Sequence, residues 1–101
     1  MINHPLQIYN KTDYSYTLTL PYSITGFTFV SKIKENATDT TVAATFGTTL
    51  NTSAKTCVFS LNDINLDVGT TYVYDVVQTD AGGSTTVLYG GKVTVLETVS
   101  L

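Results

Sequence analysis

The sequence predicts an all-β fold, because its apolar residues alternate with polar ones and no segment repeats them at a helical spacing of useful length. The alternating segments are short, and turns separate them at intervals of about 8–12 residues. The last third of the chain adds a sharper signal. Residues 66–72 have the pattern Leu-x-x-Gly-Thr-x-Tyr, and two alternating segments joined at Gly82-Gly83 follow them. Together these features predict an immunoglobulin-like (Ig-like) antiparallel β-sandwich of about seven strands.

Four strands are predicted in the first half of the chain. A short strand covers Leu6–Ile8, and a second covers Tyr14–Leu20, where tyrosine and leucine alternate with serine and threonine. A third covers Phe27–Lys34 on the same alternation. The fourth begins at Val42 and is expected to break at Gly47, because a glycine weakens a strand and often marks a bend.

Three strands are predicted in the second half. They cover Cys57–Leu61, Tyr72–Val76 and Val87–Val95, each with alternate apolar residues. The last strand contains Gly90 and Gly91, which we expect to form a β-bulge.

The segment before the sixth strand has a structural role in such sandwiches. A tyrosine early in that strand can turn its hydroxyl back to the backbone a few residues upstream, which ties the crossover to the strand. We therefore interpret Tyr72 as structural and not as a ligand contact, with Leu66 beginning the motif and Gly69 supplying the turn geometry. The pattern also resembles the corresponding corner of fibronectin type III domains. Gly82 and Gly83 are expected to turn the closing hairpin.

Size and charge restrict the kind of protein. A chain of 101 residues fits one domain, residues 1–101. Only 13% of the residues are charged and threonine makes up about a fifth of the chain, so we expect threonine-rich outer faces. The net charge of -3, with five lysines and no arginine, argues against a nucleic-acid partner and against an anionic membrane surface.

The chain carries no recognisable membrane or secretion signal. No apolar run approaches the roughly 20 residues that a spanning helix needs. Residues Met1–Leu6 lack the basic and apolar regions of a signal peptide, so we expect synthesis and folding in a cytoplasm.

Few residues are candidates for chemistry. Cys57 is the only cysteine, which excludes an internal disulfide, and its alternation with Phe59 and Leu61 predicts a core position. The alternative is a reactive thiol, but no basic neighbour in the sequence would activate it. His4 is the only histidine and is expected to be a solvated residue at a frayed terminus, so we expect no catalytic triad. We predict that the protein is not an enzyme and has no cofactor.

One segment has the oxygen spacing of a calcium loop. Asp63, Asn65 and Asp67 place oxygen side chains at every second position. An EF-hand, however, needs glycine at the sixth position and a bidentate glutamate at the twelfth. Here Gly69 is seventh and Tyr74 is twelfth. We interpret the apolar residues Ile64, Leu66 and Val68 as an inward stripe and predict no metal.

Two further predictions concern the surface. Tyr9, Tyr22 and Tyr89 fall near predicted strand ends, and tyrosine is enriched at interfaces, so these three are interface candidates. Asp75 faces outward from the sixth strand and is predicted to pair with Lys92 across the closing hairpin, a contact worth about 0–1 kcal/mol.

Four segments carry a family resemblance. They are Thr25–Lys34, a glycine followed by a strand that ends in Ile-Lys; Leu66–Val76; the hairpin Thr79–Gly83; and Leu88–Val95, with Val99 following. These features are similar to those of small phage virion domains, among them the N-terminal Ig-like domains of upper baseplate proteins, related tail-fibre adaptors and capsid decoration proteins. Family members often carry a charged Asp-x-Gly between early strands and a longer C-terminal region, whereas this sequence ends at Leu101.

The resemblance implies a docking module without an attached effector. We expect a non-enzymatic structural protein of a phage virion, made in the host cytoplasm and present in many copies. It would be a capsid decoration (cement) protein bound to the major capsid protein, or else a small baseplate or tail component. The expected mechanism is edge-strand pairing with burial of end-loop tyrosines and of terminal arms such as Glu97–Leu101. The alternative is a glycan- or receptor-binding surface module, which would need a cluster of exposed aromatic side chains.

Overall fold

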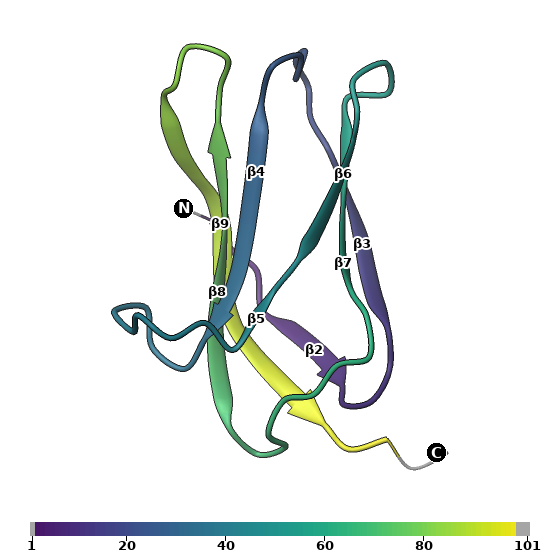
Figure 1. Ribbon diagram of the computed structural model, residues 1–101, viewed down its shortest axis with the longest axis vertical. Helices are drawn as coiled ribbons and strands as arrows, with labels where there is room; N and C mark the ends of the chain where they lie inside the picture. Colours follow the sequence, from purple (N-terminus) through teal and green to yellow (C-terminus); the bar gives the residue numbers. More distant parts are fainter. Residues whose placement is uncertain (1, 99–101) are drawn as a thin grey trace.

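The computed structural model describes residues 2–98, which form two β-sheets packed face to face (Figure 1). The prediction of an all-β sandwich is thereby confirmed. The larger sheet contains β1 (Ile2–Asn3), β2 (Leu6–Tyr9), β4 (Thr28–Lys34), β5 (Ala44–Thr45), β8 (Thr71–Thr79) and β9 (Thr85–Leu96). The smaller sheet contains β3 (Tyr14–Thr19), β6 (Gly47–Asn51) and β7 (Thr56–Leu61). In this part of the chain no helix could cross a membrane.

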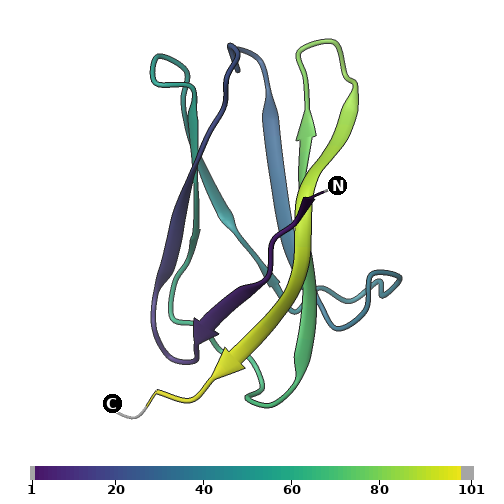
Figure 2. The same cartoon turned by 180° about the vertical axis from the view of Figure 1, so that it is seen from behind.

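The strand order shows that the first two strands pair with the last one. The larger sheet has the order β1-β9-β8-β4-β5, with β2 also paired to β9, and the smaller has the order β3-β7-β6. Strands β1 and β2 run parallel to β9, whereas the other pairs are antiparallel. Figure 2 shows the N-terminal strands lying along β9. The first strands therefore belong to the larger sheet, which leaves β3 with β7 as its one neighbour.

The core lies between the sheets because every second side chain of the central strands points inward. Burial alternates along β4, β7 and β8. Phe59 of β7 is fully buried, stacks on Tyr16 at a ring distance of 5.1 Å, and meets Phe29 and Phe46 edge-on at 6.4 Å. Burying a side chain of this size contributes about 1.5–3 kcal/mol relative to exposing it.

The break expected at Gly47 is where the chain changes sheets. Strand β5 pairs with β4 in the larger sheet, and β6 pairs with β7 in the smaller one. Between them Phe46 is buried, and its N–H donates to the carbonyl oxygen of Ser31 at 2.9 Å. The predicted fourth strand is therefore two strands, one in each sheet.

The pair Gly90-Gly91 does not form the predicted β-bulge, because both residues pair in regular register with β8. The irregularity lies between Val76 and Val77 of β8, where Leu88 of β9 has no partner. The interpretation of the two glycines as a bulge was therefore wrong.

Close approach of other backbone explains these glycines instead. A Cβ atom on Gly90 would lie 2.5 Å from the carbonyl oxygen of Tyr74. A Cβ atom on Gly91 would lie 2.9 Å from Oδ1 of Asn3 and 3.1 Å from the carbonyl oxygen of His4. The glycines let β8 and the N-terminal segment approach β9 on either side.

The C-terminal segment leaves the sheet after Leu96, so the last strand does not continue through it. Thr98 donates from its hydroxyl to the carbonyl oxygen of Asn10 at 2.6 Å, which holds this segment beside the β2–β3 turn. The remainder of the predicted arm, residues 99–101, lies outside the described residues, and so does Val99 of the family motif.

Candidate functional site

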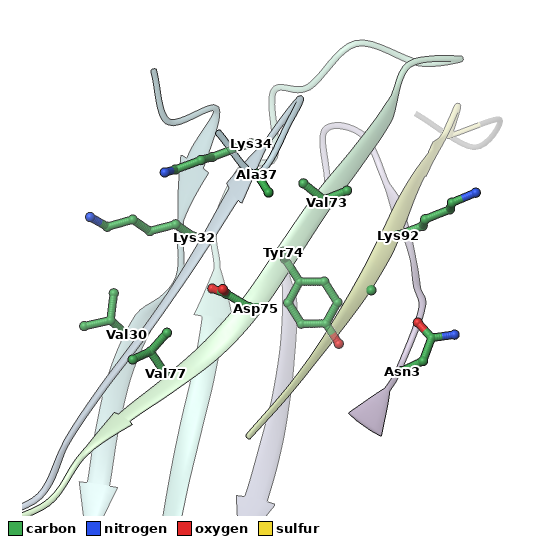
Figure 3. Close-up of a pocket in the computed structure, with 11 residues that line it drawn as sticks. Asn3, Val30, Lys32, Lys34, Ala37, Val73, Tyr74, Asp75, Val77 and Lys92 are labelled. Carbon is green, nitrogen blue, oxygen red and sulfur yellow. The ribbon is translucent and has the colours of Figure 1, made fainter. Parts of the chain in front are cut away.

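A groove of about 640 Å³ lies on the outer face of the larger sheet, over β4, β8 and β9 (Figure 3). The loop after β4 borders it at Ala37, and the N-terminal segment borders it at Asn3. The groove faces away from the core, so its lining side chains are mostly the outward members of the alternating strands, and the buried Tyr74 is the exception.

The register of β4 against β8 places the lining side chains in rows. Val30 lies opposite Val77, and Lys32 lies opposite Asp75. Lys34 lies opposite Val73 in the next row. Because side chains that face each other across a pair of strands share one face of the sheet, these residues form a continuous surface that is apolar at one end and basic at the other.

Three of the five lysines of the chain line this groove: Lys32, Lys34 and Lys92. Asp75 is the one carboxylate among the lining residues. The predicted pair between Asp75 and Lys92 is out of register, because Lys92 lies opposite Val73, and Asp75 faces Lys32 on its other side. That prediction was wrong: among residues 2–98 no lysine and carboxylate form an ion pair. Because three lysines and one aspartate line it, the groove has a net positive charge.

The N-terminal border of the groove is fixed by the backbone of His4. Its N–H donates to the carbonyl oxygen of Gly90 at 2.7 Å, and its carbonyl oxygen accepts from the Tyr74 hydroxyl at 2.5 Å. The His4 ring is exposed, as expected, with Nδ1 3.2 Å from the same hydroxyl and the ring edge-on to Tyr89 at 5.5 Å. The expectation of a frayed terminus was wrong for this residue. Burial raises the pKa of Tyr74, so its hydroxyl stays a neutral donor at ordinary pH.

The predicted hydrogen bond from the corner tyrosine is present. Tyr72 is buried, and its hydroxyl accepts from the N–H of Asp67 at 3.0 Å. Gly69 has a φ of +87°, which suits a glycine in the turn. Leu66 is buried, and its N–H donates to Oδ1 of Asn10 at 3.0 Å. The segment therefore holds the crossover against the sandwich.

The oxygen side chains with the spacing of a calcium loop, Asp63, Asn65 and Asp67, lie in this same crossover. Ile64 is buried with Leu66, as the inward stripe predicted, whereas Val68 is 48% exposed and does not belong to that stripe. The carboxylate of Asp13 accepts from the N–H of Asp63 at 2.7 Å. Within residues 2–98 no three His, Cys, Asp or Glu side chains are grouped so as to hold a metal ion.

The closing hairpin turns at Gly82 and Gly83, and Gly83 has a φ of +90°. The residue that organises the turn is Asp80, which sequence analysis missed. Its carboxylate accepts from the N–H groups of Gly82 and Ser84, both at 2.9 Å. Aspartate that caps nearby backbone in this way is typical of turns, so the signal was present in the sequence.

The three candidate interface tyrosines do not form one cluster. Tyr9 is 51% exposed at the end of β2, at the lower end of the sandwich in Figure 1. Tyr22 is 39% exposed in the β3–β4 connection at the other end, and its hydroxyl donates to Oε1 of Gln78 at 2.6 Å. Tyr89 is half-buried and packs on the core, at 6.3 Å from the Tyr74 ring.

The single thiol lies in the core. Cys57 is fully buried on β7, as its alternation predicted, and burial raises the pKa of its thiol. A buried thiol with a raised pKa is a poor nucleophile.

The two sheets differ at their edges. The edge strands of the larger sheet are short: β1 and β5 have two residues each, and β2 has four. The edge strands of the smaller sheet, β3 with six residues and β6 with five, are longer. Their sequences, Tyr14–Thr19 and Gly47–Asn51, contain neither a charged residue nor proline.

Sequence analysis missed the groove because its two borders come from distant parts of the chain. The strand pattern correctly predicts that Asp75 faces outward, but only the strand register shows which lysines lie beside it in the groove.

No protein-family model matches the chain, and no curated protein matches it.

Proposed function

We propose that this protein is a non-enzymatic assembly module that binds other protein subunits through the edges of its smaller sheet. The observation that carries the proposal is the pair of open, uncharged edge strands β3 and β6. An unpaired edge presents a row of N–H and C=O groups that can pair with a strand of another chain.

Neither edge strand of the smaller sheet carries a charged residue or a proline. Proteins that remain monomeric usually protect a long edge with lysine, proline or a bulge. The larger sheet has short edge strands, which give little room for pairing. In β3 the residues that face outward are Ser15, Thr17 and Thr19, which suit a pleated surface and do not repel an added strand.

The family resemblance supports a place in a phage particle. We propose that the protein is a capsid decoration protein or else a small baseplate or tail component, present in many copies. An Ig-like topology is part of this proposal: β3, β7 and β6 form one sheet, the β8–β9 hairpin closes the other, and Tyr72 occupies the corner. The glycan-binding alternative is less well supported, because Tyr9 and Tyr22 lie at opposite ends of the sandwich.

Composition analysis of purified particles tests the biological setting. We expect mass spectrometry to detect the protein in particles, and its absence would contradict the proposal. A copy number comparable to that of the major capsid protein would favour decoration, and one comparable to that of tail subunits would favour the tail.

Single lysine substitutions test the mechanism. Thr17→Lys on β3 and Thr49→Lys on β6 each place a charge on an open edge. The matched control is Thr94→Lys, an exposed position on β9, which has neighbours on both sides. We expect at least one edge variant to lose incorporation into particles while the control retains it. Equal incorporation of all three folded variants would show that the edges are not used.

A further inference from the structure

Charge is divided between two regions of the surface. The groove on the larger sheet is lined by three lysines and one aspartate, although the chain as a whole has a net charge of -3. The loop after β4 also carries two carboxylates, Glu35 and Asp39, but neither lines the groove, and the carboxylate of Asp39 accepts from the N–H of Asn36 at 3.2 Å.

Four of the eight acidic residues lie at the end of the sandwich that carries the β2–β3 turn and the β7–β8 crossover, at the bottom of Figure 1. Asp13 and Asp63 are joined there by a hydrogen bond. Asn10 bonds to Leu66 and to Thr98, which brings the adjoining residues Asp67 and Glu97 to the same end. We call these four exposed carboxylates, Asp13, Asp63, Asp67 and Glu97, the acidic end. Lys11 is exposed in the same turn, where its N–H donates to the carbonyl oxygen of Ile64, so this end has a net charge of -3.

Both regions also expose apolar side chains. Val30, 44% exposed, and the half-buried Val77 lie beside the lysines in the groove. At the acidic end Tyr9 is 51% exposed and Val68 is 48% exposed. Interfaces bury apolar anchors of this kind, and charges of opposite sign around them fix the orientation of the partners.

We infer that the groove binds the acidic end of a second copy of this chain. Lys32, Lys34 and Lys92 of one copy would face the carboxylates of the next, and Val68 or Tyr9 would pack against the apolar part of the groove. The two surfaces are different, so the contact is heterologous and can repeat from copy to copy in a ring or a filament. This contact is separate from edge pairing and does not depend on the proposed function.

Exchange of charge between the two regions tests the inference. The groove variant is Lys32→Glu with Lys92→Glu, and the end variant is Asp67→Lys with Glu97→Lys. All four side chains are exposed, so these changes avoid the core. We expect the native protein to associate in sedimentation velocity at about 0.02 M salt and to dissociate at about 0.5 M, where screening is strong.

Each variant alone should be monomeric, because its groove and its end then carry charges of the same sign. With Lys11 counted at the end, the groove variant has net charges of -2 in the groove and -3 at the end, and the end variant has +2 and +1. An equimolar mixture should associate again, since each groove then meets an end of opposite charge. We expect the apparent dissociation constant of each variant alone to rise at least about tenfold over that of the native protein. Lys92→Glu alone should weaken association relative to the native protein. Its matched control is Lys55→Glu, an exposed lysine in the β6–β7 turn, which should associate like the native protein.

Three results would overturn the inference: a native protein that stays monomeric at low salt, variants that associate alone, or a mixture that does not associate. Thr17→Lys and Thr49→Lys separate it from the proposed function. Association that these edge variants abolish and that charge reversal does not change would contradict the groove contact while supporting edge pairing.

Discussion

Tyr74 on β8 donates a hydrogen bond of 2.5 Å to the carbonyl oxygen of His4, a residue 70 positions earlier in the chain. The His4 amide is bonded to Gly90 of β9, so the short break between β1 and β2 is held from two strands. Tyr74 therefore both fills the core with its ring and fixes the N-terminal border of the groove.

Removing this hydroxyl should loosen the N-terminal segment. We expect Tyr74→Phe to lower the free energy of unfolding by about 1–3 kcal/mol, because the part-buried His4 carbonyl loses its partner. Hydrogen exchange should become faster across β2. Tyr9→Phe is the matched control, because that ring is 51% exposed, and it should change stability by less than about 0.5 kcal/mol. If β2 in Tyr74→Phe kept its protection against hydrogen exchange, the proposed role of the Tyr74 hydroxyl would be contradicted.

The two glycine pairs should respond differently to alanine. Gly90→Ala would place its Cβ 2.5 Å from the carbonyl oxygen of Tyr74, so we expect destabilisation of about 3 kcal/mol or loss of the folded state. Gly82→Ala would place its Cβ 3.4 Å from Oδ1 of Asp80 in an exposed turn, and it should change stability by less than about 1 kcal/mol. Urea unfolding of both variants checks this order, and equal stability would show that β8 can move away from β9.

The removal of two different buried tyrosine hydroxyls should change the stability of the protein differently. Tyr72→Phe leaves the Asp67 N–H without its acceptor and should destabilise the protein by about 1 kcal/mol. The Tyr16 hydroxyl is buried with no hydrogen-bond partner among residues 2–98. Tyr16→Phe should therefore leave stability unchanged or raise it. Thermal unfolding of the two variants measures the difference, and a destabilised Tyr16→Phe would indicate a partner for that hydroxyl.

Alkaline pH should destabilise the fold through its tyrosines. Burial raises the pKa of the hydroxyls of Tyr14, Tyr16, Tyr74 and Tyr89. Above about pH 10 the unfolded chain loses protons that the folded chain retains, so the free energy of unfolding falls as the pH rises. Below that pH these groups are neutral in both states and contribute no pH dependence.

Urea unfolding at about pH 8 and about pH 11 measures this loss, and tyrosinate absorbance shows how many rings ionise in the folded protein. Tyr16→Phe should show a shallower loss of stability than the native protein. A free energy of unfolding that does not change across this range would contradict the prediction.

Sequence reasoning succeeded where the signal is local. Alternation along residues 57–61 and 72–76 predicted both strands and their inward faces, and the corner pattern predicted the hydroxyl contact of Tyr72. These features depend on neighbouring residues and on one short turn. They need no knowledge of which strands pair.

It failed where a residue depends on a distant partner. Gly90 and Gly91 were interpreted as a bulge, because the sequence does not show that the segment around His4 crosses β9 at that place. The pairing of Asp75 with Lys92 failed because the hairpin register places Gly90 opposite Asp75 and Lys92 opposite Val73, which the sequence alone does not show. The groove was missed for the same reason, since Asn3 and Ala37 approach it only in the folded chain.

The parallel pairing of β1 and β2 with β9 has a consequence for folding. The first strands have no partner until the last strand has been made, so the larger sheet cannot be completed during synthesis of the first 84 residues. Contacts between the two ends of a chain slow folding, because a long loop must close before they form. Strands β1 and β2 are therefore made before the strand that they pair with, and they can be fixed in the larger sheet only after β9 has been made.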